Sequence, residues 1–372
     1  MKKKLAILLV LSILFTLIAA CATEQPTEPT PAPAATQPTE PPSAPETTQP
    51  TEPPPDSTDT QPEEPVEIIV TDQLGRDVLI PETVSSVAVS HGPMLALVVA
   101  LGGGDLVVGT GPKASGRTIY EVVAPNVIEA PQIGQQANLN LEELANISPD
   151  LFILSARNRD MLPDLDMLGI AGVAVDPENF ETIITSMRII GAAIQNTEHV
   201  ENIIQLFEQR LAWTRERAAQ VTHNPTALLF GRGVTEVAAA NMIQADLLEI
   251  AGAINLASDV EGTSYVDVGI EQVLLWNPEY IFISAWGPLQ PEDFFDEPRL
   301  AEVTAVRDGN VFKIPSDAEW WDTPSVVTVL GAIWVTHMIH PDLITAEELD
   351  YAVEEFYYLL HGIRLGRAYF GY

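Results

Sequence analysis

The sequence predicts an α/β protein in which two lobes with mainly parallel sheets are joined by a single long helix. One observation is the segment 197–221, whose apolar residues recur at helical spacing along one stripe. A second is the alternation of strand-like and helix-like segments on both sides of it, which favours parallel sheets. A third is an internal repeat with one copy in each half.

The long segment is expected to form one helix between the lobes. Its buried stripe would consist of Val200, Ile203, Ile204, Phe207, Leu211 and Ala218. Thr197 can cap its start, and Asn224-Pro225 stops the helical pattern. At 1.5 Å per residue it would span about 37 Å, which is about the diameter of a small domain. The alternative is one more helix within a single α/β domain.

The repeat consists of residues 141–155 and 270–284. Each copy reads as a short amphipathic helix, a polar-Pro-acidic turn and an apolar strand that ends in serine. Glu142 and Glu271 stand at the same offset from the prolines of their turns. We therefore expect the two residues to occupy equivalent places in the two lobes.

Residues 1–20 have the pattern of a secretory signal. Three lysines precede an apolar core, which is too short for a comfortable membrane span. The core ends in Ala19-Ala20-Cys21, and Cys21 is the only cysteine. We predict that Cys21 is lipidated, with an ordinary cleaved signal as the alternative. Since the chain has no second cysteine, the sequence excludes internal disulfides and thiolate metal sites.

Residues 22–65 contain Pro, Thr, Glu and Gln but no Val, Ile, Leu, aromatic, Lys or Arg residue. Such a segment has too little apolar surface to form a core, so we expect a disordered tether over 21–65. The predicted N-terminal lobe is 66–196, the linking helix 197–221 and the C-terminal lobe 222–372. Glycosylation of the tether is left open.

The chain is strongly acidic, with 18 Lys and Arg against 52 Asp and Glu and a net charge of −34. This charge argues against a nucleic-acid partner and against an anionic membrane face.

In chain order, the remaining patterns predict one element after another. A hairpin is expected at 66–70 and 77–80, because two β-type runs flank the turn 73–76. Further strands are expected at 86–90, 106–109, 150–155, 171–175, 226–230, 280–284 and 311–314, where short apolar runs stand between turn residues. Helices are expected at 94–101, 119–124, 160–168, 179–194, 243–251, 325–339 and 346–360. Gly102-Gly103-Gly104 and Gly252 stop two of these helices.

In parallel α/β lobes, ligands bind at loops that leave the carboxyl ends of strands. Those loops supply the candidate ligand-binding residues: His91, Arg117, Arg157, Arg159, Arg232, Trp286, Trp320 and Trp321. Arginines there would suit a ligand with carboxylate or other oxyanion groups, and tryptophans a flat or apolar one. The alternative is that the arginines pair with surface carboxylates and the tryptophans lie in the core.

Catalytic and metal patterns are weak. The six histidines are scattered, and His337 and His340 lack a nearby acidic third ligand. Gly231-Arg232-Gly233 fails the dinucleotide motif, and there is no Walker loop or nucleophile elbow. We therefore predict no catalytic residue, no metal site and no cofactor beyond iron carried in a bound cargo. An extracytoplasmic hydrolase and a structural lipoprotein are kept as alternatives.

Residues 66–372 resemble the class III substrate-binding proteins of ABC importers, which take up cobalamin, haem and ferric siderophores. The resemblance rests on 71–76, on the block from Asn140 to Leu151, on its echo from Glu271 to Pro278, and on 321–325. It implies two lobes joined by a rigid helix. It also implies that Glu142 and Glu271 dock onto arginines of a membrane permease.

On this resemblance we expect a monomeric, lipid-anchored, extracytoplasmic protein. It would capture a ferric-siderophore-type complex between its lobes and deliver it to a permease dimer with its ATPase subunits. Cobalamin is the alternative cargo, followed by haem.

Overall fold

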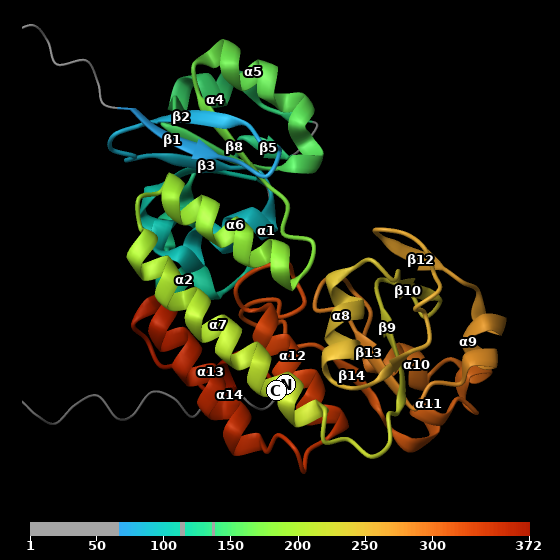
Figure 1. The fold of residues 1–372 in the computed structure, drawn as a ribbon. Helices are drawn as coiled ribbons and strands as arrows, with labels where there is room; N and C mark the ends of the chain where they lie inside the picture. Colours follow the sequence, from blue (N-terminus) through green and yellow to red (C-terminus); the bar gives the residue numbers. More distant parts are fainter. Residues whose placement is uncertain (1–66, 112–115, 136–137) are drawn as a thin grey trace, which may run out of the picture. The chain divides into compact units, whose positions relative to one another are not determined.

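The computed structural model describes residues 67–111, 116–135 and 138–372, all within one compact unit, Pro62–Tyr372 (Figure 1). The predicted signal 1–20, Cys21, the tether 21–65 and the first residue of the predicted N-terminal lobe lie outside the described residues. The sheets and helices below therefore concern the two predicted lobes and the helix between them.

The N-terminal half contains a four-stranded parallel sheet in the order β4-β3-β7-β8. Its strands are β3 (Val87–Val89), β4 (Val107–Thr110), β7 (Leu151–Ser155) and β8 (Ala171–Val175). All side chains of β3 and β7 are buried, as expected for strands covered on both faces. The predicted hairpin is present as β1 (Glu67–Thr71) and β2 (Asp77–Pro81), which pair antiparallel.

The C-terminal half contains a six-stranded sheet with a parallel centre. β9 (Thr226–Phe230), β13 (Tyr280–Ile283) and β14 (Val311–Lys313) run parallel, and β11 (Ile254–Asn255) pairs parallel with β9. β10 (Glu236–Ala238) and β12 (Tyr265–Asp267) extend the sheet antiparallel. Reading β11-β9-β13-β14 gives the same parallel order as β4-β3-β7-β8. The α/β class and the mainly parallel sheets predicted from the sequence are confirmed.

The internal repeat has the same backbone geometry in both halves. α4 (Leu141–Ile147) ends at Ser148 with φ 45° and ψ 61°, and α9 (Ile270–Trp276) ends at Asn277 with φ 44° and ψ 62°. Both residues are left-handed although neither is glycine, and each is followed by proline, which cannot continue a helix. Each turn then leads into the central strand β7 or β13.

The acidic residue of each turn fixes the start of the neighbouring strand. An Asp150 carboxylate oxygen accepts hydrogen bonds from the backbone and hydroxyl groups of Ser85 and Ser86, at 2.8 to 2.9 Å. A Glu279 oxygen accepts from the backbone N–H and hydroxyl of Thr226, at 2.8 and 3.1 Å. The sequence repeat is therefore a structural repeat that sets the register of β3 against β7 and of β9 against β13.

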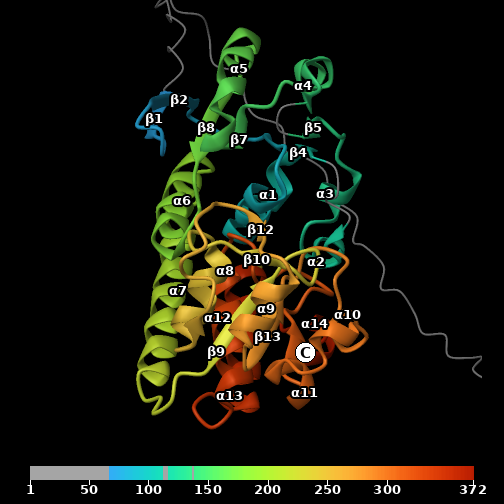
Figure 2. The ribbon, with the colours of Figure 1, turned by 90° about the vertical axis from the view of Figure 1, so that its right-hand side faces the viewer.

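The linking helix is α7 (Thr197–Ala218), which begins at the predicted residue and ends three residues before the predicted one. The chain turns at 219–220 because hydrogen bonds of three-residue spacing replace the α-helical ones, from Gln220 N–H to the Arg217 carbonyl and from Val221 N–H to the Ala218 carbonyl. α7 packs against α6 (Phe180–Ala193), α8 (Ile243–Ile250), α12 (Thr328–Ile339) and α13 (Ala346–His361). Figure 2 shows α6 and α7 following one another along one side of the molecule.

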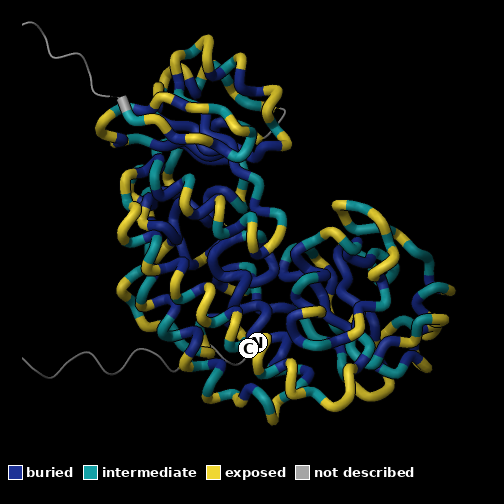
Figure 3. The backbone as a smooth tube through the Cα atoms, in the orientation of Figure 1, coloured by how far each residue is buried: buried dark blue, intermediate teal, exposed yellow. Residues whose placement is uncertain are grey.

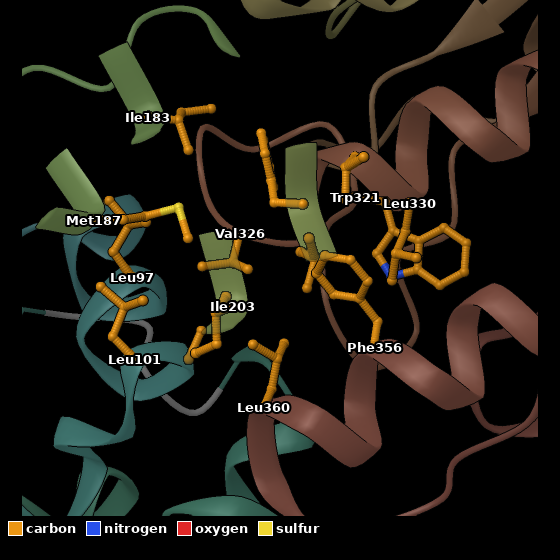
Figure 4. Packing of buried hydrophobic residues seen from close by; sticks show 14 of the residues in the cluster. Leu97, Leu101, Ile183, Met187, Ile203, Trp321, Val326, Leu330, Phe356 and Leu360 are labelled. Atoms are coloured by element: carbon orange, nitrogen blue, oxygen red, sulfur yellow. The ribbon is translucent and has the colours of Figure 1, made fainter. Parts of the chain in front are cut away.

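The largest apolar cluster continues from the N-terminal half into the C-terminal half. It includes Leu97, Leu101 and Met187 from the first half, Ile203 and Phe207 of α7, and Leu330 and Phe356 from the second. Figure 4 shows several of these side chains gathered around Ile203, and Figure 3 shows buried stretches of the tube in the interior of both halves, with exposed stretches on the outside. A core shared in this way resists separation of the two halves.

The remaining elements are short and mainly cover the sheets. In the N-terminal half they are α1 (Gly92–Val98), η1 (Val99–Gly103), η2 (Gly104–Leu106), α2 (Ile119–Val123), α3 (Pro125–Glu129), β5 (Gly134–Gln135), β6 (Asn138–Leu139), η4 (Ala156–Met161) and α5 (Leu162–Leu168). In the C-terminal half they are α10 (Pro291–Phe295), η5 (Pro298–Leu300), α11 (Thr304–Asp308) and α14 (Arg367–Phe370).

Two of the helix predictions differ from the structure for local reasons. The helix expected over 160–168 is the end of η4 followed by α5, which begins at Leu162 with Pro163 in its first turn, a position that proline favours at a helix start. The helix expected over 325–339 begins at Thr328, because the Thr328 hydroxyl is engaged by the Ser325 backbone N–H and by the Thr323 carbonyl.

Candidate functional site

The predicted ligand-binding residues come from loops at the carboxyl ends of parallel strands in both halves. His91 follows β3, Arg117 comes from the segment after β4, and Arg157 and Arg159 lie in η4 after β7. Arg232 follows β9, Trp286 follows β13, and Trp320 and Trp321 come from the segment after β14. The structure therefore places the candidates where α/β sheets bind ligands, but their surroundings differ greatly.

Arg117 is 4% exposed, which is unusual for an arginine in so acidic a protein. Its Nη1 donates hydrogen bonds to the Gly92 carbonyl at 2.9 Å and to Tyr120 Oη at 3.1 Å. Its Nε and Nη2 are buried and have no hydrogen-bond partner among the described residues. A buried guanidinium with unused donors is costly unless an anionic oxygen accepts from it, so Arg117 can hold an anion.

The two halves meet at Arg117. Its guanidinium carbon lies 4.6 Å from the centre of the Trp320 ring, within cation–π range. Beside it, Thr118 Oγ1 donates to the Asp317 carbonyl at 3.1 Å, and the Ile119 N–H donates to the Ala318 carbonyl at 3.2 Å. Arg117 is thus held between its own half and the segment that follows β14.

His91 presents a neutral ring to the same region. Burial, followed by the positive charges of Arg117 and Arg157, lowers the pKa of His91 to about 4. Its Nδ1 is buried without a partner within the described part of the chain. At neutral pH His91 can therefore offer one donor and one acceptor but no charge.

Arg157 and Arg159 have different environments. Arg157 is half exposed and forms an ion pair with Glu178. Burial raises the pKa of Glu178, although the charge of Arg157 opposes the rise. Arg159 is exposed. Arg157 would have to exchange Glu178 for an anionic ligand, whereas two donor nitrogens of Arg117 have no partner in the part of the chain that the structure describes.

In the C-terminal half, Arg232 lies over Trp286, with 5.4 Å between the guanidinium carbon and the ring centre. Its Nε is 3.5 Å from a carboxylate oxygen of Glu236. The preceding residue, Gly231, packs against Tyr265 so closely that an added Cβ would lie 2.6 Å from the ring. Any other residue would push Tyr265 away, so this loop depends on glycine for its conformation.

Trp321 does not lie at the ligand edge, contrary to its prediction as a ligand-binding residue. It is fully buried, and its Nε1 donates to Tyr357 Oη at 3.3 Å. Its ring is 5.4 Å from that of Phe370 and 5.2 Å from that of Tyr372. The chain turns between Trp320 and Trp321, so the second ring enters the core and stabilises the packing of the C-terminal segment.

Comparison with known proteins agrees with this two-lobed arrangement of strand-end loops. A family model described as "Periplasmic binding protein" matches residues 87–318, which include both parallel sheets and α7. The chain belongs to the periplasmic binding protein family. Members of this family bind solutes, so the chain is a solute-binding protein, and the family resemblance seen in the sequence is confirmed.

The chain is also similar to individual proteins, which match different shares of its length. Molybdate-binding protein MolA of Haemophilus influenzae is 23% identical over 324 residues, which are 78% of this chain and 89% of that protein. The vitamin B12-binding protein of Photorhabdus laumondii is 25% identical over 179 residues, 47% of this chain and 64% of that protein. A periplasmic solute-binding protein from Veillonella parvula has a TM-score of 0.73 and 26% identity, covering 82% of this chain and 95% of that one.

The two glutamates predicted to dock a permease occupy equivalent places in the family fold. Glu142 is exposed in the first turn of α4, and Glu271 is exposed in the first turn of α9. Both helices have seven residues and the same left-handed end. Each half therefore presents one carboxylate from the same position of the repeat.

Other kinds of site find little support in the described parts of the chain. Those parts contain no group of three or more His, Cys, Asp and Glu side chains that could hold a metal ion. His337 Nδ1 lies 2.7 Å from the Ile344 carbonyl, which gives this histidine a structural partner. None of the helices in 67–111, 116–135 and 138–372 is both long and apolar enough to cross a membrane.

Several polar residues near the strand ends were missed by sequence reasoning. Glu319 is 5% exposed and accepts a hydrogen bond from Tyr357 Oη at 2.8 Å. Asp322 is 1% exposed and accepts one from Ser284 Oγ at 2.5 Å. Both residues lie in the loop after β14, which was selected as a candidate because of its tryptophans. The sequence signal that could have indicated them is the presence of two carboxylates directly beside Trp320 and Trp321.

Proposed function

We propose that this protein captures an anionic iron complex of the ferric-siderophore type between its two lobes. The observation that carries the proposal is Arg117, a buried arginine at the meeting of the halves with two donor nitrogens that have no hydrogen-bond partner in 67–111, 116–135 and 138–372. Catecholate and carboxylate oxygens of such a complex would accept from those nitrogens. The half-exposed Arg157 and Arg232 would add longer-range attraction.

A bare oxyanion such as molybdate is a second candidate cargo. It is favoured by the similarity to molybdate-binding protein MolA, because the match covers 89% of the length of that protein. The enclosed position of Arg117 also suits a small anion. Cobalamin and haem are less favoured, because the faces of Trp286 and Trp320 are already covered by guanidinium groups.

Delivery to an ABC importer is the second part of the proposal. Glu142 and Glu271 would each contact one subunit of a permease dimer, and ATPase subunits would drive transport. Lipidation of Cys21 would hold the protein, as a monomer, on the outer side of the cell membrane. The equivalence of α4 and α9 supports the docking role, since a two-subunit partner needs one contact from each lobe.

Calorimetric titration with a defined cargo panel tests the proposed cargo. The panel contains a ferric tris-catecholate complex, sodium molybdate, cyanocobalamin and haemin. We expect the ferric complex to bind tightest, and Arg117→Ala to weaken it by about 1.5–3 kcal/mol, the usual worth of a hydrogen bond to a charged group. If molybdate binds more tightly than the other three ligands, the cargo is a bare oxyanion and not an iron complex.

A matched control separates loss of charge from loss of the site. Arg188→Ala also removes one arginine, but this residue pairs with Glu201 on the surface of α6 and α7. Its affinity for the ferric complex should equal that of the unmodified protein. If Arg117→Ala binds as tightly as Arg188→Ala, Arg117 is not a cargo residue.

A further inference from the structure

The carboxylate of Glu319 is held from one side by the C-terminal half. Glu319 directly precedes Trp320, the residue that covers Arg117. One of its oxygens accepts a hydrogen bond from Tyr357 Oη of α13 at 2.8 Å, and that hydroxyl accepts from Trp321 Nε1 at 3.3 Å. Tyr357 and Trp321 are both fully buried. The position of the carboxylate is therefore fixed by core side chains.

From the other side, Glu319 lies within the influence of the Arg117 charge of the N-terminal half, since the Arg117 guanidinium stacks on the next residue, Trp320. Burial has the largest effect on Glu319 and raises its pKa, and the positive charge of Arg117 opposes that rise. Both charges also act on the buried Tyr120. The hydrogen bonds of Arg117 within the described residues go to Gly92 and Tyr120, and none goes to Glu319. The acid and the base therefore attract one another without a direct bond, which leaves the guanidinium open to a stronger partner.

We propose that Glu319 is the counter-ion of Arg117 in the cargo-free protein, and that it takes up one proton when an anionic cargo binds Arg117. This inference rests on the proposed function, because it requires a negatively charged cargo. It adds a specific role: Glu319 makes the affinity for that cargo depend on pH.

The direction of this effect follows from the charges around the carboxylate. Burial raises the pKa of Glu319, while Arg117 and the hydrogen bond from Tyr357 oppose the rise. An anion on Arg117 would cancel the favourable positive charge and add a repulsive one, so the pKa would rise further. The tyrosines facing this group, Tyr120 and Tyr357, have raised pKa values and stay neutral at physiological pH.

At pH values between the lower pKa of Glu319 in the cargo-free protein and its higher pKa in the cargo-bound protein, cargo binding is accompanied by uptake of a proton. By linkage, affinity then increases as pH falls through that interval, by up to about tenfold per pH unit for one proton. Above the bound-state pKa both states are ionised, and the dependence ends. The protein would hold its cargo more tightly at the low-pH end of that interval than at its high-pH end.

Calorimetry in two buffers of different ionisation enthalpy measures this proton directly. The full chain is titrated with a ferric tris-catecholate complex and with sodium molybdate, in PIPES and in Tris, across a pH series; phosphate is avoided because it is itself an oxyanion. We expect uptake approaching one proton per bound anion. Glu319→Gln should abolish the uptake and bind about tenfold more tightly at the alkaline end, because the competing charge is gone.

Two further variants keep the test decisive. Glu355→Gln removes a carboxylate of α13 that pairs with Arg210, and it should retain the full uptake. Tyr357→Phe removes the hydrogen bond to Glu319, so the interval of proton uptake should move to higher pH. The Tyr357→Phe variant therefore still tests the role of Glu319 in proton uptake if Glu319→Gln does not fold.

The outcomes distinguish this inference from the proposed function. Anion binding without proton uptake, or uptake that persists in Glu319→Gln, would overturn the role of Glu319 and leave anion capture intact. An unmoved interval in Tyr357→Phe would also contradict it. If neither anion binds the unmodified protein, the proposed function itself fails, and the inference fails with it.

Discussion

At the scale of single residues, a few buried polar groups determine both the fold and the site. Arg117 and Glu319 come from different halves and are almost fully buried, so each depends on partners that only folding provides. Asp150 has a comparable role in the fold, since one of its oxygens accepts four hydrogen bonds from Ser85 and Ser86.

Replacement of Asp150 by Ala should lower the free energy of unfolding by about 1–3 kcal/mol, because backbone donors at the start of β3 lose their acceptor. Burial raises the pKa of Asp150, but the hydrogen bonds from Ser85 and Ser86 outweigh it and lower the pKa. A lowered pKa gives stability that is present above the unfolded-state value of about 3.9 and is lost as pH falls below it. Denaturant unfolding at pH 7 and pH 3 should show the difference between the two proteins shrinking at pH 3.

An exposed carboxylate provides the control for this prediction. Glu208→Ala changes a residue on the exposed face of α7 and should leave stability within about 0.5 kcal/mol. Equal stability of Asp150→Ala and Glu208→Ala would mean that the turn does not fix β3.

At the scale of elements, the two copies of the helix–turn–strand repeat are used for two purposes. Their turns fix the neighbouring strands through Asp150 and Glu279, and their helix starts expose Glu142 and Glu271. In each lobe, the turn of the motif therefore stabilises a neighbouring strand, and the start of its helix exposes a carboxylate.

The double change Glu142→Ala with Glu271→Ala should leave cargo affinity and thermal stability nearly unchanged, because both side chains are exposed. Uptake into cells, and stimulation of the transporter's ATPase in vesicles, should fall by more than in either single variant. The pair Glu216→Ala with Glu302→Ala also removes two exposed carboxylates and should transport normally. Normal uptake by the Glu142→Ala, Glu271→Ala variant would show that these glutamates do not dock a permease. Loss of cargo binding in this variant would show that they belong to the cargo site and not to a docking surface.

At the scale of the whole molecule, α7 is part of a core that runs from one half into the other. Ile203 and Phe207 of α7 belong to the same apolar cluster as residues from both sheets. α13 adds a second connection, since it packs against both α7 and η1. This arrangement favours small movements of the ligand loops over wide closure of the lobes.

Small-angle scattering with and without bound ferric complex should therefore show almost the same radius of gyration. The expected change is less than about 1 Å, because a shared close-packed core deforms little. Cargo binding should be verified on the same samples. A decrease of several ångströms on binding would show that the lobes close as rigid bodies about a hinge.

Anchoring is also a property of the whole molecule, and it concerns the part of the chain outside the described residues. Cys21→Ala should release the protein from the membrane fraction into the soluble fraction or the medium, because the acyl chains would have no attachment site. Fractionation with an antibody to the folded part measures this. If Cys21→Ala stays in the membrane fraction with its signal cleaved, the lipid anchor is wrong.

The sequence alone was sufficient for the features that depend on local patterns. Period-two and period-3.6 apolar runs located most strands and the long helix, and the Pro-acidic turns revealed the repeat. The positions of Arg117 and His91 in loops after predicted strands indicated them as candidate ligand-binding residues from the sequence alone. The strands β10, β11 and β12 were missed because they form through pairing with β9 or β10, which the local sequence does not reveal.

Tertiary structure alone decided which candidate arginine is buried and which tryptophan belongs to the core. Arg117 and Arg232 are alike as strand-end residues in the sequence, but packing against Trp320, Gly92 and Tyr120 buries only the first. Trp320 and Trp321 are adjacent, but Trp321 is fully buried in the core, whereas Trp320 is only partly buried at the edge of the same cluster and lies against Arg117. Burial depends on contacts between residues far apart in the chain, and it is burial that converts ordinary charges such as Arg117 and Glu319 into a chemical site.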